Sequence, residues 1–312
     1  MKRLADIGED ALIASLVEEL GASEPSEGLV VGPGDDCAVI DVGDVERWQL
    51  LKTDAIVEGV HYAAATSGER VGWKAVARVV SDFAAMGGTP SQLLVTIAMP
   101  PNRELAYVQS IYRGLQRCAR SFGAGICGGE TTSVPDGGCA MISIAGTGWV
   151  QKDQLVLRSG GEAGDVVFVT GRLGGSIQGK HLDFTPRVEE SAWLVEHFKP
   201  RAMMDLSDGL AQDLPRLAYA SGLNYRLDHE MIPRTAGCSV DAALQDGEDF
   251  ELLISMPSNK IAGLDSAWRE RFPDLDLTAI GSLIPGKCSP LAGGWEHFRS
   301  ESSEEPGASP RG

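Results

Sequence analysis

The segment Met204-Asp205-Leu206-Ser207-Asp208-Gly209-Leu210 combines two carboxylates, a hydroxyl and a glycine in a short stretch. Carboxylate and hydroxyl oxygens are the ligands that hard cations such as Mg²⁺ prefer, and glycine lets a backbone approach closely. The same chemistry recurs along the chain, in Gly34-Asp35-Asp36, Thr53-Asp54, Ser81-Asp82 and Gly247-Glu248-Asp249. Together these segments predict a site for magnesium and phosphate.

Composition limits the possible classes of protein. The chain has 312 residues, of which 43% are hydrophobic, and this is long enough for two ordinary domains. The formal net charge of −17 argues against a nucleic-acid partner, because binding to a phosphate backbone requires clustered Lys and Arg. No apolar run approaches the length of a membrane span, and the N-terminal segment has no apolar leader. We therefore expect a soluble, cytoplasmic protein that binds no membrane.

The six cysteines show no C-x-x-C pair and no zinc-finger spacing. They are typical of small buried side chains in a reducing compartment, so we expect no disulfide framework.

Alternation of apolar runs with turn residues predicts a mixed α/β chain in two domains. The polar, glycine-bearing stretch 151–164 marks the boundary, which gives domains 1–150 and 151–299 and a disordered tail 300–312. We expect helices over 10–20, 70–86, 105–123, 188–197, 209–220 and 259–272. We expect strands over 29–31, 37–42, 48–51, 93–98, 125–132, 139–150, 166–170, 202–205, 224–228, 250–256 and 277–282.

The predicted helix 70–86 has two distinct faces. Its apolar side chains, such as Trp73, Val76 and Val80, form one stripe at helical spacing, and Asp82 points away from that stripe. Lys74, Arg78 and Ser81 fall on the same side as Asp82.

A glycine-rich segment, Gly174 to His181, matches G-x-x-x-x-G-K after a predicted strand. A P-loop requires Ser or Thr after the lysine to bind magnesium, and this chain has His181 there. We interpret the segment as a glycine turn and keep the P-loop as the alternative.

In series, the acidic motifs identify a family. The chain resembles thiamine-monophosphate kinases, members of the aminoimidazole ribonucleotide synthetase, or PurM-like, superfamily. The likeness covers nearly the whole chain except the tail. It rests on the order and spacing of 34–38, Thr53-Asp54 with Val57-Glu58-Gly59-Val60-His61-Tyr62, 80–87, 204–210 and 247–253.

The resemblance implies an α+β fold with PurM-like N-terminal and C-terminal domains. It also implies a homodimer in which the N-terminal sheets pair and ATP binds between the domains across the dimer. The implied reaction is direct, magnesium-assisted transfer of the ATP γ-phosphoryl to thiamine monophosphate, which gives thiamine diphosphate. Such a transfer depends mainly on positioning and charge neutralisation.

Motif matching also implies roles for single residues. The implied metal ligands are Asp36, Thr53, Asp54, Asp82, Glu130, Asp205 and Asp208, of which Asp54, Asp82 and Asp208 are the catalytic set. The implied ATP contacts are Tyr112, Gly129, Glu130, Arg158 and Ser207. The implied thiamine-phosphate contacts are His61, Glu248 and Trp295.

Each motif also has a structural interpretation. Asp35-Asp36 can be a turn pair, Asp205 to Gly209 a helix cap, and Asp82 a solvated partner of Arg78. His61 and Trp295 can be packing residues. The functional interpretation is favoured because the motifs occur together.

The chain departs from the family pattern at Lys52, where Ser or Thr is usual, at Glu130, where Asp is usual, and at Asp246, where Gly is usual. Lys52 puts an ammonium in place of a metal-binding hydroxyl, so it bears on the number of metal ions. Two further functions remain open: another ATP-using superfamily member such as a selenophosphate synthetase, or a cation- or nucleotide-binding homologue with impaired catalysis.

Overall fold

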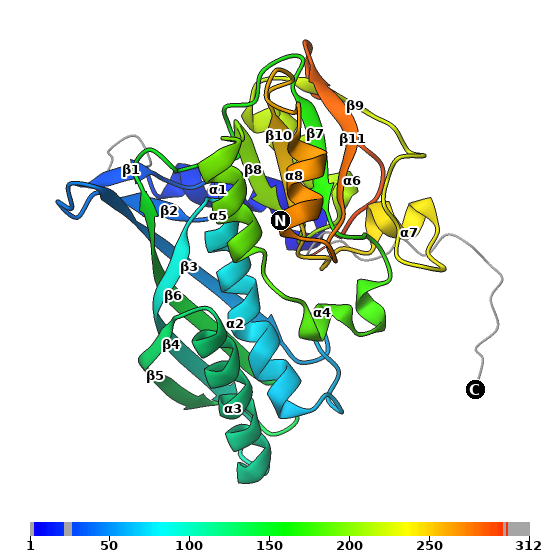
Figure 1. The fold of residues 1–312 in the computed structure, drawn as a ribbon. Coiled ribbons are helices and arrows are strands. Elements are labelled where there is room, and N and C mark those ends of the chain that lie inside the picture. Colours follow the sequence, from blue (N-terminus) through cyan, green and yellow to red (C-terminus); the bar gives the residue numbers. More distant parts are fainter. Residues whose placement is uncertain (1–2, 22–26, 296–297, 299–312) are drawn as a thin grey trace.

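The computed structural model describes residues 3–21, 27–295 and 298. These residues form two β-sheets with helices packed around them (Figure 1). The fold is α+β, which confirms the predicted fold class.

The first sheet has six strands in the order β1-β2-β3-β6-β4-β5. All neighbours are antiparallel except β4 and β5, which run parallel. Helices α2 and α3 pack beside this sheet (Figure 1). The elements of this half are α1 (Leu4–Glu19), β1 (Leu29–Val31), β2 (Ala38–Ile40), β3 (Arg47–Val57), α2 (Gly68–Ala85), β4 (Thr89–Met99), α3 (Leu105–Ser121), β5 (Gly125–Ser133) and β6 (Met141–Gln151).

Helices α2 and α3 approach each other so closely that glycine is required at the crossing. A Cβ atom at Gly72 would lie 2.0 Å from the Ile111 carbonyl oxygen, and one at Gly114 would lie 2.0 Å from the Glu69 carbonyl oxygen. Backbone atoms cannot move aside at small cost, so these glycines fix the position of α2 against α3.

The second sheet has five antiparallel strands in the order β8-β10-β7-β11-β9. The segment 152–165 connects the last strand of the first sheet, β6, to the central strand of the second sheet, β7. The strands are β7 (Val166–Thr170), β8 (Ala202–Asp205), β9 (Asn224–Leu227), β10 (Leu252–Met256) and β11 (Leu277–Ile284). The helices are a 3₁₀ turn at Ser176–Gln178, α4 (Lys180–Asp183), α5 (Val188–His197), α6 (Leu210–Ala220), α7 (Val240–Gln245) and α8 (Leu264–Arg271).

Helix α2 lies between the two halves of the molecule (Figure 1). One side of it packs on β3, β4 and β6, and the other contacts α4, α5 and β8. Its polar stripe is therefore not a solvent face: Lys74, Ser81 and Asp82 are all buried. Periodicity predicted which residues share this face, and the second half of the chain covers it.

Several predicted elements differ in length from those observed. The expected strand 48–51 is much longer, because β3 runs to Val57 and so contains Thr53-Asp54. The expected helix 10–20 begins at Leu4 and has a kink at Gly8, and the expected helix 259–272 is only Leu264–Arg271. The short helices α4 and α7 were not predicted, since so few residues give no periodicity.

All six cysteines are free, but only Cys37 and Cys118 are buried, so the expectation of mostly buried cysteines was wrong.

The predicted division at 150/151 falls beside the end of the first sheet at Gln151 and remains a prediction. The tail 300–312 lies outside the described residues. Among the helices that the structure describes, none has the length and apolar character needed to cross a bilayer.

Candidate active site

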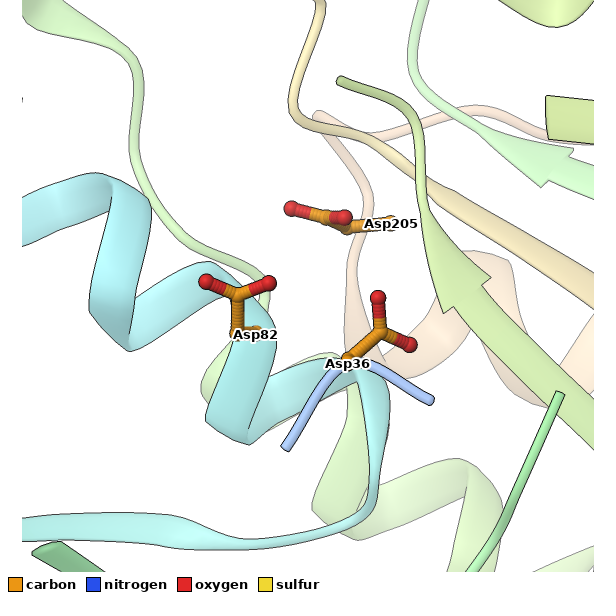
Figure 2. A group of neighbouring side chains, drawn as sticks. All are labelled: Asp36, Asp82 and Asp205. Atoms are coloured by element: carbon orange, nitrogen blue, oxygen red, sulfur yellow. The ribbon is translucent and has the colours of Figure 1, made fainter. Parts of the chain in front are cut away.

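Three aspartates from distant parts of the chain meet between the two halves. Asp36 lies in the loop between β1 and β2, Asp82 on α2, and Asp205 at the end of β8. One oxygen from each carboxylate lies within 4.8 Å of the others, and all three side chains are buried. Figure 2 shows the carboxylates facing a common space. In the described part of the chain, this aspartate triad is the only such cluster of Asp, Glu, His or Cys.

Each aspartate of the triad has a different neighbour. The Arg158 guanidinium lies 2.5 Å from Asp36 Oδ1, and Lys52 Nζ lies 2.8 Å from Asp82 Oδ1. The Ser81 hydroxyl donates to Asp205 Oδ2 at 2.6 Å. Asp36 Oδ2 is buried and has no hydrogen-bond partner among the described residues. A buried carboxylate oxygen without a partner is costly, so a cation at this point fits the residues present.

Burial and mutual repulsion affect the protonation of the triad. Burial, followed by the charge of Asp36, raises the pKa of Asp205 to about 6. Burial also raises the pKa of Asp82 well above its ordinary value, although Lys52 acts in the opposite direction. Crowded carboxylates of this kind are stabilised by a bound divalent cation.

Asp54 and Arg78 form a second part of the site. On β3, Asp54 points toward α2, where Arg78 Nε lies 2.6 Å from Oδ2 and Arg78 NH2 lies 3.2 Å from Oδ1. The structural interpretation in which Asp82 pairs with Arg78 is therefore wrong, because Asp82 pairs with Lys52 and Arg78 with Asp54. Since strand side chains alternate, Thr53 stands on the opposite, exposed face of β3.

Lys74 on α2 connects the segments that carry His61 and Glu248. Its fully buried ammonium donates to the His61 carbonyl oxygen at 2.6 Å and to Glu248 Oε2 at 2.7 Å. His181 Nδ1 lies 2.8 Å from Lys74 Nζ and 3.0 Å from Glu248 Oε2. Arg78 NH1 lies 3.4 Å from the other Glu248 oxygen. We call Lys74, Arg78, His181 and Glu248 the glutamate clamp.

Protonation within this region follows from burial and charge. Burial, together with the charge of Arg78, lowers the pKa of His61 to about 4, so the ring is neutral at pH 7. Burial alone would raise the pKa of Glu248, but the contact with His181 and the charge of Lys74 lower it to about 2. Burial lowers the pKa of Lys74 to about 8, although Glu248 opposes this shift. The clamp therefore holds an ionised glutamate at neutral pH.

The loop after β8 brings the remaining C-terminal candidates together. Ser207 accepts a backbone hydrogen bond from Glu248, and the carbonyl oxygen of Asp208 accepts one from Trp295. The Asp208 carboxylate contacts Arg216, which also lies 3.1 Å from the buried Asp213. The Trp295 side chain is half exposed at the rim of this loop.

Three sequence candidates lie apart from the triad. Gly129 and Glu130 are exposed on the edge strand β5, and Tyr112 is exposed on α3. Across the sheet, Glu130 aligns with Thr96, then Ser143, then Ala55. These are three strand spacings of ~4.8 Å each, so the Glu130 backbone lies about 14 Å from β3 in the same chain. Within one chain, Glu130 does not join the cluster.

The first two glycines of the turn 174–181 already use their backbone N–H groups. The backbone N–H of Gly174 donates to the Asp249 carboxylate, and that of Gly175 donates to Asp246 Oδ2 at 2.6 Å. Lys180 Nζ lies 2.9 Å from Glu251 Oε1. Because these donors already bind carboxylates, the structure favours the turn over the P-loop.

No role in binding or catalysis was predicted from the sequence for Lys74, Arg78 and His181. The signal for the first two was present, since both lie on the polar face of α2 with Ser81 and Asp82. No local pattern could identify His181, because only the fold brings α4 to the glutamate clamp.

Comparison with known proteins places this chain in a family. Residues 34–150 match the family described as AIR synthase related protein, N-terminal domain. A thiamine-monophosphate kinase of Rhodopirellula baltica is 37% identical over 274 residues, which cover 82% of this chain and 84% of that protein. One from Aquifex aeolicus is 30% identical over 330 residues, covering 95% of this chain and all of that protein.

A solved structure shares both the fold and the extent of the chain. It is AaThiL complexed with AMPPCP and TMP, with a TM-score of 0.80 and 29% identity, and the match covers 96% of this chain and 99% of that one. The two cover nearly the same length, so the likeness includes both sheets. The chain belongs to the thiamine-monophosphate kinase family.

Proposed function

We propose that the protein is a kinase that transfers the γ-phosphoryl group of ATP to the phosphate of thiamine monophosphate, forming thiamine diphosphate and ADP. The observation that carries this proposal is the buried aspartate triad, with its unpartnered Asp36 oxygen, beside a group of buried cations. The relative of known structure was complexed with AMPPCP, an ATP analogue, and TMP.

Asp36, Asp82 and Asp205 are the residues that would hold Mg²⁺. Bound there, the metal would supply charge neutralisation between two anionic phosphates. Following the family motifs, we assign Asp54 and Asp208 to the rim of the same metal site. Thr53, on the opposite face of β3, and Glu130, on β5, would not reach this site within one chain.

The chain's own cations would bind and orient the phosphate groups. Arg158 and Arg78 are guanidinium groups already fixed by Asp36 and Asp54, and a planar guanidinium can bind phosphate oxygens in a defined orientation. No general base is needed, since the nucleophile is an ionised phosphate oxygen. The low pKa of His61, about 4, agrees with a binding role for this residue rather than proton transfer.

The acceptor would lie between His61, Glu248 and Trp295. Thiamine monophosphate carries a cationic thiazolium and a flat pyrimidine. The ionised Glu248 offers a negative charge, and the half-exposed Trp295 ring offers an aromatic face. Arg78, which contacts both Asp54 and Glu248, would thus connect the phosphate-binding and ring-binding parts of the site.

A homodimer would supply the parts that lie far from the triad in one chain. The uncovered face of the first sheet exposes Leu51 and Leu94, and β5 is an edge strand. Pairing of two such sheets would bury these leucines and could bring Tyr112, Gly129 and Glu130 of one copy to the ATP side of the other.

Product analysis tests the function. The purified protein is incubated with MgATP and thiamine monophosphate, and the products are separated by chromatography. The proposal requires equal amounts of thiamine diphosphate and ADP and no free orthophosphate. Release of orthophosphate in step with ADP would instead indicate a synthetase of the same superfamily, and absence of turnover would indicate an impaired homologue.

A further inference from the structure

Lys52 is a long cationic side chain that the fold turns toward buried carboxylates. On β3 it shares a face with Leu50, Asp54 and Ile56, of which Leu50 and Ile56 are buried. Its side chain is only 23% exposed, and its ammonium lies 2.8 Å from Asp82 Oδ1. Lysines at strand ends usually extend to water. Lys52 lies in the middle of β3, and its ammonium contacts the Asp82 carboxylate instead.

The charges around the triad are unevenly compensated. Asp82 has a full positive charge beside it from Lys52, and Asp36 has one from Arg158 on a single oxygen. Asp205 accepts a hydrogen bond from the neutral Ser81 hydroxyl and feels Lys52 and Arg158 only as neighbouring charges, and the second oxygen of Asp36 has no partner among the described residues. The negative charge without a direct cationic partner thus lies between Asp36 and Asp205. On the Asp82 side, the Lys52 ammonium already supplies a positive charge.

We propose that the Lys52 ammonium replaces one divalent cation on the Asp82 side of the phosphate site. The inference rests on the proposed function in that it assumes a metal-assisted phosphoryl transfer. One divalent ion then binds the aspartate triad on its Asp36 and Asp205 side, and Lys52, which contacts only Oδ1 of Asp82, takes the place of a second divalent ion there. An ammonium has three donors for phosphate oxygens and needs no dissolved ion, so this part of the site is charged at every magnesium concentration.

Three variants separate charge from structure. Lys52→Thr removes the charge and introduces a hydroxyl, a ligand suited to Mg²⁺ or Mn²⁺. Lys52→Arg keeps the charge. Lys260→Thr makes the same chemical change at an exposed lysine far along the chain, after β10.

The first readout is Mn²⁺ binding by the protein alone, followed by electron paramagnetic resonance without nucleotide or acceptor. We expect Lys52→Thr to bind about one more Mn²⁺ per chain than the wild type, and Lys52→Arg and Lys260→Thr to match the wild type. Equal stoichiometry in Lys52→Thr and the wild type would overturn the inference.

The second readout is the Mg²⁺ concentration that gives half-maximal turnover. We expect it to rise about tenfold in Lys52→Thr, with full activity recovered at high Mg²⁺. Superimposable magnesium curves would also overturn the inference. Mn²⁺ binding is measured without substrates, so the two proposals can fail separately. A failed kinase assay would contradict the proposed function and leave the role of Lys52 to the Mn²⁺ measurement. Equal Mn²⁺ stoichiometry in an active kinase would refute the role of Lys52 and leave the proposed function intact.

Discussion

At the residue scale, the site depends on aspartates that repel one another in the folded chain. Asp205 is the most informative of them, because its partner is the neutral Ser81 hydroxyl and its pKa is raised to about 6. Because the pKa of Asp205 is raised from 3.8 to about 6, its ionised form destabilises the fold. This cost is fully present above pH 6, decreases as the pH falls from 6 to 3.8, and is absent below 3.8. Metal binding removes the same repulsion.

Asp205→Asn should abolish turnover and yet stabilise the metal-free protein. Asparagine can still accept from Ser81, so the local geometry is kept, while one buried charge is lost. We expect at least a hundredfold loss of thiamine diphosphate formation and a gain of about 1–3 kcal/mol in unfolding free energy at pH 7 without Mg²⁺. Denaturant unfolding in EDTA measures the second quantity. A less stable variant would show that Asp205 is a structural carboxylate.

The glutamate clamp makes acceptor binding depend on pH. Lys74 faces Glu248 and His181, with Arg78, Asp54 and His61 nearby, and its pKa is about 8. It is charged below pH 8 and neutral above, so Glu248 loses one of its holding charges as the pH rises through 8. Loss of the Lys74 charge leaves Glu248 with more uncompensated negative charge toward the thiazolium, so the KM for thiamine monophosphate should decrease several-fold from pH 7 to 9 while kcat changes little.

Lys74→Met is the variant that checks this explanation. It should show the high-pH KM at every pH, with the KM for ATP unchanged. A wild-type acceptor KM that is flat between pH 7 and 9 would contradict the assigned role of Lys74.

At the element scale, the glycine turn and helix α2 show what local sequence can decide. The turn was predicted because His181 follows Lys180 where a P-loop needs a Ser or Thr hydroxyl. The structure favours the turn, because the N–H groups of Gly174 and Gly175 donate to Asp249 and Asp246. Lys180→Ala should therefore reduce activity less than threefold, whereas Asp208→Asn should abolish it. Comparable losses in the two variants, with ATP binding gone in Lys180→Ala, would restore the P-loop.

The α2–α3 crossing predicts a large loss of stability. Gly72→Ala would place a methyl group 2.0 Å from the Ile111 carbonyl oxygen, so the helices must separate. We expect a loss of about 3 kcal/mol or more in unfolding free energy. Gly32→Ala, whose Cβ would meet only the Leu29 side chain at 3.5 Å, should be nearly neutral. Equal melting temperatures for the two variants would contradict the close packing.

Much of this fold could be predicted from the sequence, and the limits have physical causes. The strands 166–170 and 202–205 were predicted with their observed bounds, and the first of them, Val-Val-Phe-Val-Thr, is rich in β-branched residues and is followed by a glycine. The polar face of α2 was also predicted, because helical periodicity depends only on neighbours along the chain. What covers that face depends on contacts distant in sequence, so the pairings of Lys74 with Glu248 and of Lys52 with Asp82 became visible only in the fold.

At the scale of the whole molecule, the aspartate triad lies between two sheets, and the proposed ATP contacts Tyr112, Gly129 and Glu130 lie on α3 and β5 of the same chain, apart from the triad. Glu130 is about 14 Å from β3, which is too far to reach the triad from within the chain. The expected remedy is a second copy, paired through the uncovered face of the first sheet.

Leu94→Glu tests this assembly, because it places a charge on the exposed face of β4 that dimerisation would bury. In analytical ultracentrifugation the wild type should sediment as a dimer of 33.1 kDa chains, and the variant as a monomer with at least tenfold weaker ATP binding. A monomeric wild type with full activity would show that no second copy is needed.

The central claim is that Asp36, Asp82 and Asp205 hold the catalytic cation, and anomalous diffraction from crystals soaked in Mn²⁺ tests it most directly. We predict an anomalous peak in the space that the three carboxylates face in Figure 2, about 2.0–2.4 Å from an oxygen of Asp36 and an oxygen of Asp205. The same soak of Asp205→Asn should lose the peak. A wild-type crystal with no peak there, under conditions in which the enzyme turns over with Mn²⁺, would contradict the claim.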